Sequence, residues 1–276
     1  MWKPGYITHG LLDHSIDQVI DLLSATGYSA LGITLGPAHL DHRQVSVPDL
    51  QELRHKLDAK GLAPSIETGG RYLLDSQKKH WPSLASAEAS GRDQRQSFYL
   101  RAIDIAAELK APVVSLWSGR NDDSRRDPEE VTGALLESLL PVLDHAAACG
   151  VMIGFEPEPG MWIESLADWR QLRTQLQHPA LGLTLDLGHL GVTESTDPVE
   201  GLKSVISEVI HIHIDDCRNQ KHEHLPLGTG ELDLPALVGE LTNHGYAGQL
   251  LVELSRDSHR APELVEQSIR YLESLC

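Results

Sequence analysis

The chain has 276 residues, and its 40 acidic against 23 basic side chains give a formal net charge of −17, which repels nucleic acid. Its three cysteines, Cys149, Cys217 and Cys276, are too few and too scattered for a disulfide framework or a cysteine-type zinc site, and this favours a reduced, cytoplasmic setting. No apolar stretch is long enough for a signal peptide or a membrane span, so we expect no membrane partner.

Eight extended apolar runs alternate with helix-patterned stretches along the whole chain. The runs lie at residues 5–10, 30–36, 63–69, 112–119, 151–160, 181–189, 209–216 and 249–255. One intervening stretch places an apolar stripe on a single helical face, made of Val131, Leu135, Leu139, Val142 and Ala146. Eight such units without a linker predict the α/β class and a single (β/α)8 TIM barrel, with residues 1–276 as one domain, rather than an open doubly wound sheet.

Capping residues mark the ends of several predicted helices. Asp127, followed by a proline and two glutamates, is typical of a helix start, and Ser165 with Asp168 resembles a capping box. Asp233 predicts another N-cap after the GTGE turn. Four glycines are expected to close helices just before strands, namely Gly27, Gly61, Gly150 and Gly245. The polar, proline-broken stretch 71–93 is expected to form a lid or rim loop.

Carboxylates and histidines gather where the later strands end. Glu156 and Glu158 stand in the fifth run, Asp186 and His189 close the sixth, and Glu253 stands in the eighth. The C-terminal strand ends of a barrel meet at one mouth, which is where the chemistry of this fold takes place. We therefore expect these side chains to lie close together.

The seventh run, HIHIDD, alternates polar and apolar side chains. Because successive side chains of a strand point to opposite faces, His211, His213 and Asp215 share one face and three isoleucines share the other. The isoleucines would pack on the helices, and the polar trio would point at the barrel axis. His211 lies deepest and is expected to support the site or to pack beneath it.

Four of these side chains, Glu156, Asp186, His213 and Glu253, would point at one spot. Three converging carboxylates repel one another and raise each other's pKa unless a cation lies between them. Mixed carboxylate and imidazole donors without a thiolate suit one divalent metal ion, such as Mn²⁺, Mg²⁺, Co²⁺, Fe²⁺ or Zn²⁺. The sequence therefore predicts a metal site at this mouth.

Five short motifs occur in a specific order, namely GFEPEP, LDLGH, HIHIDD, LPLGTGELD and LVE. In this order they resemble the xylose isomerase-like TIM barrel family, which includes sugar-phosphate isomerases and epimerases and the AP endonuclease family 2 enzymes of the endonuclease IV type. The resemblance to its epimerase branch implies that Glu156, Asp186, His213 and Glu253 bind one divalent metal. It also implies that Glu156 and Glu253 are catalytic and move protons.

The resemblance implies substrate contacts as well. His189 follows the metal-binding Asp by three residues and corresponds to a residue that contacts substrate oxygen in the epimerases; Glu158, His222 and His224 are further candidates. His222 stands where the endonuclease branch has Asp, and Glu67 is the nearest candidate for its strand-three His. These departures count against a trinuclear zinc site, and a second metal at His222 and His224 stays an alternative.

The predicted function is a metal-dependent sugar or sugar-phosphate isomerase or epimerase that moves a proton through a metal-stabilised enediolate. Its partner would be a small sugar or sugar phosphate, and the resemblance leaves a homo-oligomer open. Arg71 and Arg120 are candidates for gripping a phosphate, and Trp81, Trp117 and Trp162 for apolar walls.

Three alternatives stand beside this prediction. A lyase or dehydratase could act on a related polyol through the same enediolate. An endonuclease IV-like metal phosphodiesterase would act on abasic DNA, against which the net charge of −17 and the absence of a basic stripe count. A non-catalytic metabolite-binding barrel would hold a sugar without turnover.

Overall fold

The computed structural model describes residues 1–275, and Cys276 lies outside the described residues. Within that range, eight parallel strands close into a barrel in the order β1-β10-β7-β6-β5-β4-β3-β2. The barrel strands are β1 (Lys3–Ile7), β2 (Ala30–Thr34), β3 (Ala63–Glu67), β4 (Val113–Leu116), β5 (Met152–Phe155), β6 (Leu181–Asp186), β7 (Val209–Ile214) and β10 (Gln249–Val252). All eight expected strands are present, and the (β/α)8 barrel is confirmed.

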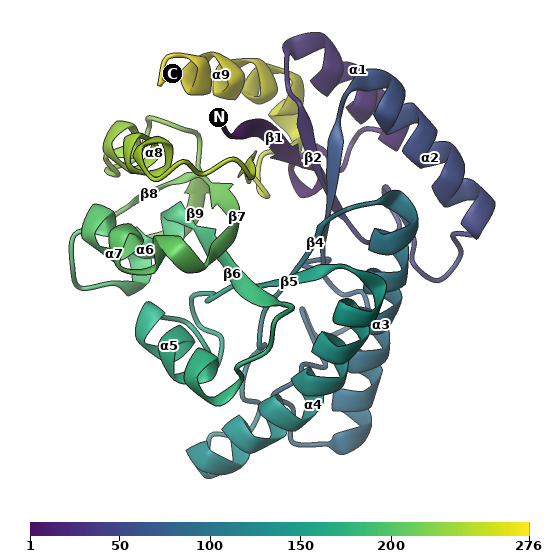
Figure 1. Ribbon diagram of the computed structural model, residues 1–276, viewed down its shortest axis with the longest axis vertical. Helices are drawn as coiled ribbons and strands as arrows, with labels where there is room; N and C mark the ends of the chain where they lie inside the picture. The colour runs from purple at the N-terminus through teal and green to yellow at the C-terminus, as the bar shows by residue number, and fades with distance from the viewer. Residues whose placement is uncertain (276) are drawn as a thin grey trace.

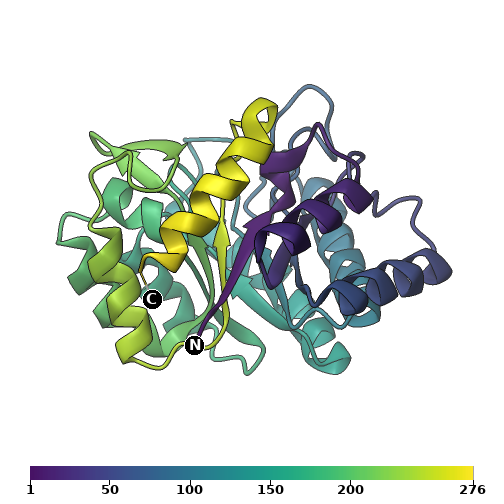
Figure 2. The same cartoon turned by 90° about the horizontal axis from the view of Figure 1, so that it is seen from above.

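The helices form a ring outside the strands, and Figure 1 shows them following one another clockwise from α1 to α9. They are α1 (Ile16–Thr26), α2 (Val47–Lys60), α3 (Ala89–Leu109), α4 (Pro128–Cys149), α5 (Leu166–Gln175), α6 (Leu187–Thr193), α7 (Pro198–Val205), α8 (Leu234–Asn243) and α9 (Ala261–Glu273). Short 3-10 helices are η1 (Thr8–Leu11), η2 (Ile206–Glu208) and η3 (Ser258–Arg260). The last helix lies outside β1 and beside α1, and so completes the ring (Figure 2).

Apolar stripes on the helices explain how this ring packs. All five residues of the predicted α4 stripe, from Val131 to Ala146, are buried, and Val265, Ile269 and Leu272 of α9 are buried in the same way. Ile212 and Ile214 of β7 are fully buried, as expected for the face of a strand covered by helices. No helix in residues 1–275 is both long and apolar enough to cross a bilayer.

The predicted caps are largely confirmed. Asp127 and Asp233 accept backbone hydrogen bonds at the starts of α4 and α8, and Ser165 forms the expected capping box of α5. Gly27, Gly61 and Gly150 close their helices in the left-handed region. The prediction for Gly245 was one residue off, because His244 caps α8 and Gly245 follows with φ 71°.

Several strands end earlier than the sequence predicts. The fifth run predicts a strand through residue 160, but β5 ends at Phe155 and Glu156 follows it. The sixth run predicts a strand through His189, but β6 ends at Asp186 because that side chain caps α6, which contains His189. The loop expected over 71–93 is also shorter, since α3 begins at Ala89.

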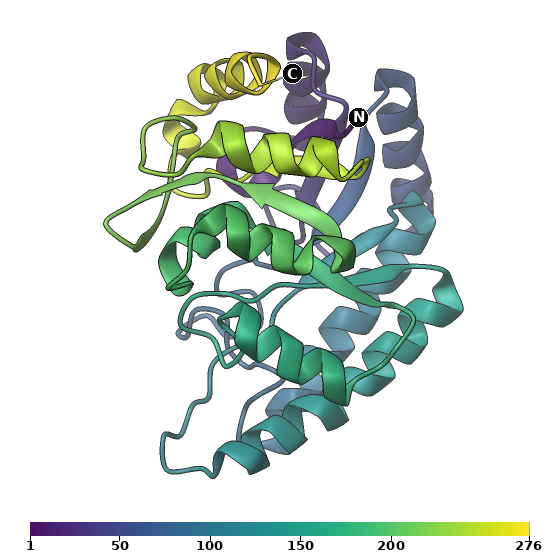
Figure 3. The same cartoon turned by 60° about the vertical axis from the view of Figure 1, so that its left-hand side comes forward.

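An antiparallel hairpin that the sequence did not predict extends β7 beyond the barrel, and it is seen from the side in Figure 3. It consists of β8 (Asp216–Arg218) and β9 (Lys221–Leu225). Asn219 and Gln220 join the strands with φ values of 55° and 54°, which match the two positive φ angles of a type I′ turn. This hairpin carries His222 and His224 to the mouth of the barrel.

Candidate metal and substrate site

The C-terminal strand ends surround a cavity of about 480 Å³. Glu67, Glu156 and His213 line its interior and are buried, whereas Trp81 and Trp117 line its wall. The cavity therefore lies at the end of the barrel where the strand ends predicted a site.

Four expected side chains converge at this end of the barrel, and three of them line the cavity while Asp186 is buried beside it. Glu156 follows β5, Asp186 ends β6, His213 lies in β7 and Glu253 follows β10, and one donor atom from each lies within 4.8 Å of the others. The barrel register explains this arrangement, because β7 pairs His213 directly with Asp186 on one side and with Leu251, two residues before Glu253, on the other. We call these four residues the quartet.

Two carboxylates of the quartet lie against the ring of His213. Its Nδ1–H donates to Glu156 Oε1 at 3.1 Å, and Nδ1 also lies 3.2 Å from Glu253 Oε2. Burial alone would lower the pKa of His213, but the charges of Glu156 and Glu67 outweigh it and raise the pKa well above its ordinary value. A positive imidazolium thus lies between carboxylates that would otherwise repel one another.

Asp186 presents its two oxygens to different surroundings. Oδ1 accepts hydrogen bonds from the backbone N–H groups of Gly188 and His189, at 2.7 and 3.2 Å, and so caps α6. Oδ2 is buried without a hydrogen-bond partner among the described residues. Its ion-pair contact with His189 Nε2 is 3.6 Å long, so this oxygen lacks the hydrogen bond that buried carboxylate oxygens normally have and is available to a cation.

Glu67, at the end of β3, supports His213 from the other side of its ring. Glu67 Oε2 lies 3.3 Å from His213 Nε2, while Oε1 accepts from Ser65 Oγ at 2.8 Å and lies 3.0 Å from His211 Nε2. Burial would raise the pKa of Glu67, but His211 and His213 outweigh it and keep the pKa below its ordinary value. Glu67 Oε2 and His213 Nε2 form an ion-pair contact without a hydrogen bond, and this contact leaves Nδ1 facing the quartet. A carboxylate on this side of the ring is the arrangement that orients metal-binding histidines.

Sequence reasoning considered Glu67 only as a stand-in for a strand-three ligand and missed this supporting position. The depth of His211 was the available signal, because a buried imidazole between strands needs a hydrogen-bond partner. The structure supplies that partner from β3.

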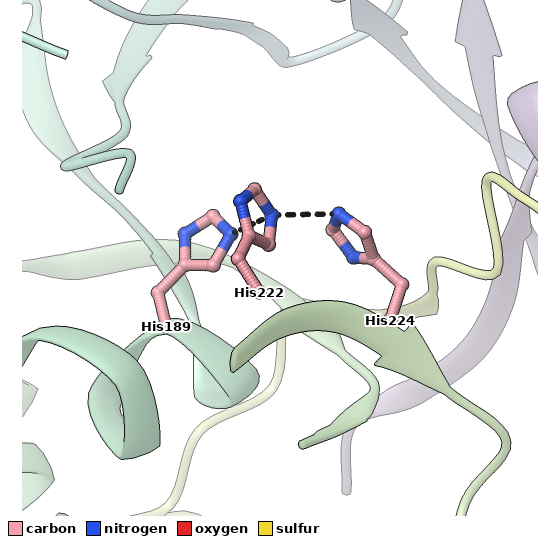
Figure 4. Close-up of side chains that lie close together, drawn as sticks. All are labelled: His189, His222 and His224. Carbon is pink, nitrogen blue, oxygen red and sulfur yellow. Dashed lines mark hydrogen bonds between the residues drawn. The ribbon is translucent and has the colours of Figure 1, made fainter. Parts of the chain in front are cut away.

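Three histidines form a second group beside the quartet, shown in Figure 4. His189 comes from α6, and His222 and His224 come from β9. Nε2 of His222 lies 3.2 Å from His189 Nε2 and 2.8 Å from His224 Nε2. We call these residues the histidine cluster.

Burial and the charged groups next to each ring decide which histidines of the cluster are protonated. Burial would lower the pKa of both outer histidines, but Asp186 and Glu158 raise that of His189 to about 9, and Asp215 raises that of His224 to about 10. Burial and these two positive neighbours lower the pKa of His222 to about 3. His222 is therefore neutral, and its Nε2 lone pair accepts a hydrogen bond from one of the two charged rings.

Glu158 adjoins the same cluster. Its Oε2 lies 3.6 Å from His189 Nε2. Burial, together with the charges of Glu156 and Glu253, raises the pKa of Glu158 to about 7. The four expected substrate contacts are thus neighbours, and Glu158, His222 and His224 line the cavity, whereas His189 is buried outside its lining.

Two expected residues lie elsewhere. Asp215 was predicted to point at the barrel axis with His213, but it pairs with Nδ1 of His224 under the hairpin, because the chain leaves the barrel after Ile214. Trp162 was predicted as a wall of the site, but its indole N–H donates to Thr132 Oγ1 at 3.2 Å, and it is not among the lining residues described.

The fold is a closed (β/α)8 barrel, and carboxylate and imidazole donors converge at its C-terminal mouth. These two features place the protein among (β/α)8 barrels with a candidate metal centre. The chain belongs to the xylose isomerase-like TIM barrel family, whose family model matches residues 20–275.

Named relatives of this family differ in the reaction that their names state. The L-ribulose-5-phosphate 3-epimerase UlaE of Shigella flexneri is 24% identical, over 84% of this chain and 82% of its own length. The inosose dehydratase of Lactiplantibacillus plantarum is 22% identical, over 82% and 80%. Among solved structures, the IOLI protein with a binding zinc atom has a TM-score of 0.78 at 18% identity, covering 99% of this chain and 97% of that one. These two relatives in sequence are thus named as an epimerase of a sugar phosphate and as a dehydratase of inosose.

Proposed function

We propose that this protein is a divalent-metal-dependent sugar epimerase or isomerase that transfers a proton at a carbon beside a carbonyl group. The observation that carries the proposal is the placement of Glu156 and Glu253. The two carboxylates approach the same nitrogen of His213, at 3.1 and 3.2 Å, at the edge of a cavity large enough for a sugar. Two carboxylates at one cavity are what a proton-removing and a proton-returning pair requires.

The quartet fits a divalent cation as its occupant. Its three carboxylates and one imidazole are oxygen and nitrogen donors, and Asp186 Oδ2 has no hydrogen-bond partner within the described residues. Glu156, Asp186, His213 and Glu253 would hold the ion, and His213 would exchange its Nδ1 proton for it. A bound divalent cation supplies positive charge that stabilises negative charge developing on the substrate oxygens.

The remaining chemistry belongs to the protein's own side chains. One of Glu156 and Glu253 removes the proton from the carbon, and the other returns a proton to the substrate. Return to the opposite face of the same carbon is epimerisation, and return to the neighbouring carbon is aldose–ketose isomerisation. Trp117 and Trp81 exclude water from one wall of the cavity.

A dehydratase is the second candidate, supported by the histidine cluster and by the inosose dehydratase relative. Both ring nitrogens of the charged His224 are engaged, with Asp215 and with the neutral His222, so a proton from His224 would reach a departing hydroxyl group through His222, which also lines the cavity. In that case the same proton removal is followed by loss of water, and the product is lighter by one water.

The test is incorporation of deuterium from deuterated water into a panel of ketoses, aldoses, their phosphates and inososes, with protein loaded with Mn²⁺, Co²⁺ or Zn²⁺. We expect one carbon-bound hydrogen to exchange in at least one compound, measured by proton NMR and mass spectrometry. A product lighter by one water supports the dehydratase. The absence of exchange in every compound, with metal bound, contradicts both.

Glu67→Gln is expected to weaken metal binding by about 10- to 100-fold, because the amide is a poorer partner for the His213 ring. Metal affinity is measured by competition with a chromophoric chelator, which does not depend on turnover. Glu52→Gln is the matched control, since Glu52 is exposed on α2 and contacts Lys56. Equal affinities for Glu67→Gln and Glu52→Gln would mean that Glu67 does not orient His213.

A further inference from the structure

The cavity has two regions of opposite charge. Its interior holds buried or partly buried acids, whereas its mouth holds exposed cations. The cations are Arg71, Lys78, Lys79, Arg120 and Arg256. They come from the segments after β3, β4 and β10, so three separate parts of the chain bring positive charge to one opening. In a protein of net charge −17 this gathering needs a cause.

The cations of the mouth are not paired with the acids of the interior. Within residues 1–275, no salt bridge involves Arg71, Lys79, Arg120 or Arg256. The interior acids contact histidines instead, as Glu67 does with His211. The cations therefore do not serve to neutralise those carboxylates by direct contact.

Hydrogen bonds to backbone carbonyl groups hold the side chains of two of the arginines in place. Arg71 donates to the carbonyl oxygen of Ser255 at 3.1 Å, and Arg256 donates to that of His222 at 2.7 Å. Each contact uses one nitrogen of a guanidinium that carries five N–H donors, so several donors stay free in each. A guanidinium held in this way is ordered before a ligand arrives.

The side chains of the other two cations, Arg120 and Lys79, form no hydrogen bond within the described residues. Arg120 packs over Gly160, where an added Cβ would lie 3.2 Å from Arg120 Nη2, so this glycine makes room for the guanidinium. Burial and then the positive charges of Arg71, Arg256 and Arg120 lower the pKa of Lys79 below its ordinary value, against the opposing charge of Glu158. All four cations line one cavity, so an anion bound there would reduce the repulsion of Lys79 by the three arginines.

We infer that the substrate carries an anionic group, a phosphate monoester or a carboxylate, which Arg71, Lys79, Arg120 and Arg256 bind at the mouth while the reacting carbons lie at the quartet. This inference rests on the proposed function for the reaction at the other end of the cavity. It also separates the relatives, because a phosphorylated ketose carries such a group and an inosose does not.

The test compares matched ligands with and without the charge. Neutral ketoses, the same ketoses as phosphates, the corresponding uronates and inorganic phosphate are titrated calorimetrically into metal-loaded protein at constant ionic strength. We expect a charged ligand to bind at least tenfold more tightly than its neutral counterpart. Phosphate or uronate as the tighter class identifies the source of the anion.

The double variant Lys79→Gln with Arg120→Gln removes two charges without breaking a hydrogen bond of either side chain in the described structure. We expect it to weaken binding of the charged ligand by about tenfold or more and to leave neutral ligands unchanged. Arg270→Gln, on the exposed face of α9, is the matched control. Equal affinity for charged and neutral ligands, or an unchanged double variant, would overturn the inference.

This experiment separates the two proposals, because binding is measured without turnover. Selective anion binding without deuterium exchange in any compound supports the anion site and contradicts proton transfer. Exchange that is equally fast in neutral and charged sugars, with equal affinities, contradicts the anion site and supports proton transfer.

Discussion

Glu253→Gln and Glu156→Gln are each expected to slow deuterium exchange by about 10²- to 10⁴-fold. Glutamine keeps the size of the side chain, and its amide oxygen still meets a cation, but it accepts no proton from carbon. Exchange is followed by proton NMR with the compound that the wild-type protein turns over. Metal content is measured on the same samples, so that loss of the ion is distinguished from loss of the base.

The matched control is Glu266→Gln on α9, where the side chain is exposed and pairs with Arg270. Loss of an exposed ion pair changes stability by less than about 1 kcal/mol, so we expect wild-type exchange from this variant. If Glu253→Gln and Glu156→Gln, with full metal content, exchange as fast as Glu266→Gln, the two carboxylates are not the proton-transfer pair.

Removal of the metal is expected to abolish exchange and to lower the melting temperature. A ligand present at about 100 times its dissociation constant stabilises the folded state by about 2.7 kcal/mol, which corresponds to roughly 5–10 °C for a chain of this size. The measurement is a thermal melt before and after dialysis against a chelator, followed by addition of Mn²⁺, Co²⁺ or Zn²⁺. Recovery of both the melting temperature and the exchange is expected with at least one ion.

His213→Ala serves as the comparison for metal removal. This variant lacks the ring that lies between the carboxylates, so its melting temperature should no longer rise when metal is added. A stabilisation by metal that is as large in His213→Ala as in the wild type would place the ion outside the quartet.

The barrel and the quartet were predictable because both depend on periodicity and strand order. Eight apolar runs give eight strands, and acids placed just after strands must meet at one mouth when parallel strands close. The positions of Glu156, Asp186, His213 and Glu253 follow from this rule, even where the strand bounds were too long.

The parts that the sequence did not predict depend on loop conformation and on contacts across the barrel. The β8–β9 hairpin turns at Asn219-Gln220, and glutamine is an uncommon residue at a positive φ, so no turn signal was present. The contact between Glu67 and His213 joins residues that are far apart in sequence, and no local pattern marks it. The pairing of Asp215 with His224 depends on the same hairpin.

The contacts of Glu67 with His211 and His213 join β3 to β7, two strands separated by three others around the closed sheet. These contacts cross the interior of the barrel and link the first half of the chain to the second. Neither half-barrel alone therefore holds an oriented imidazole, and the precise shape of the mouth requires that both halves have assembled.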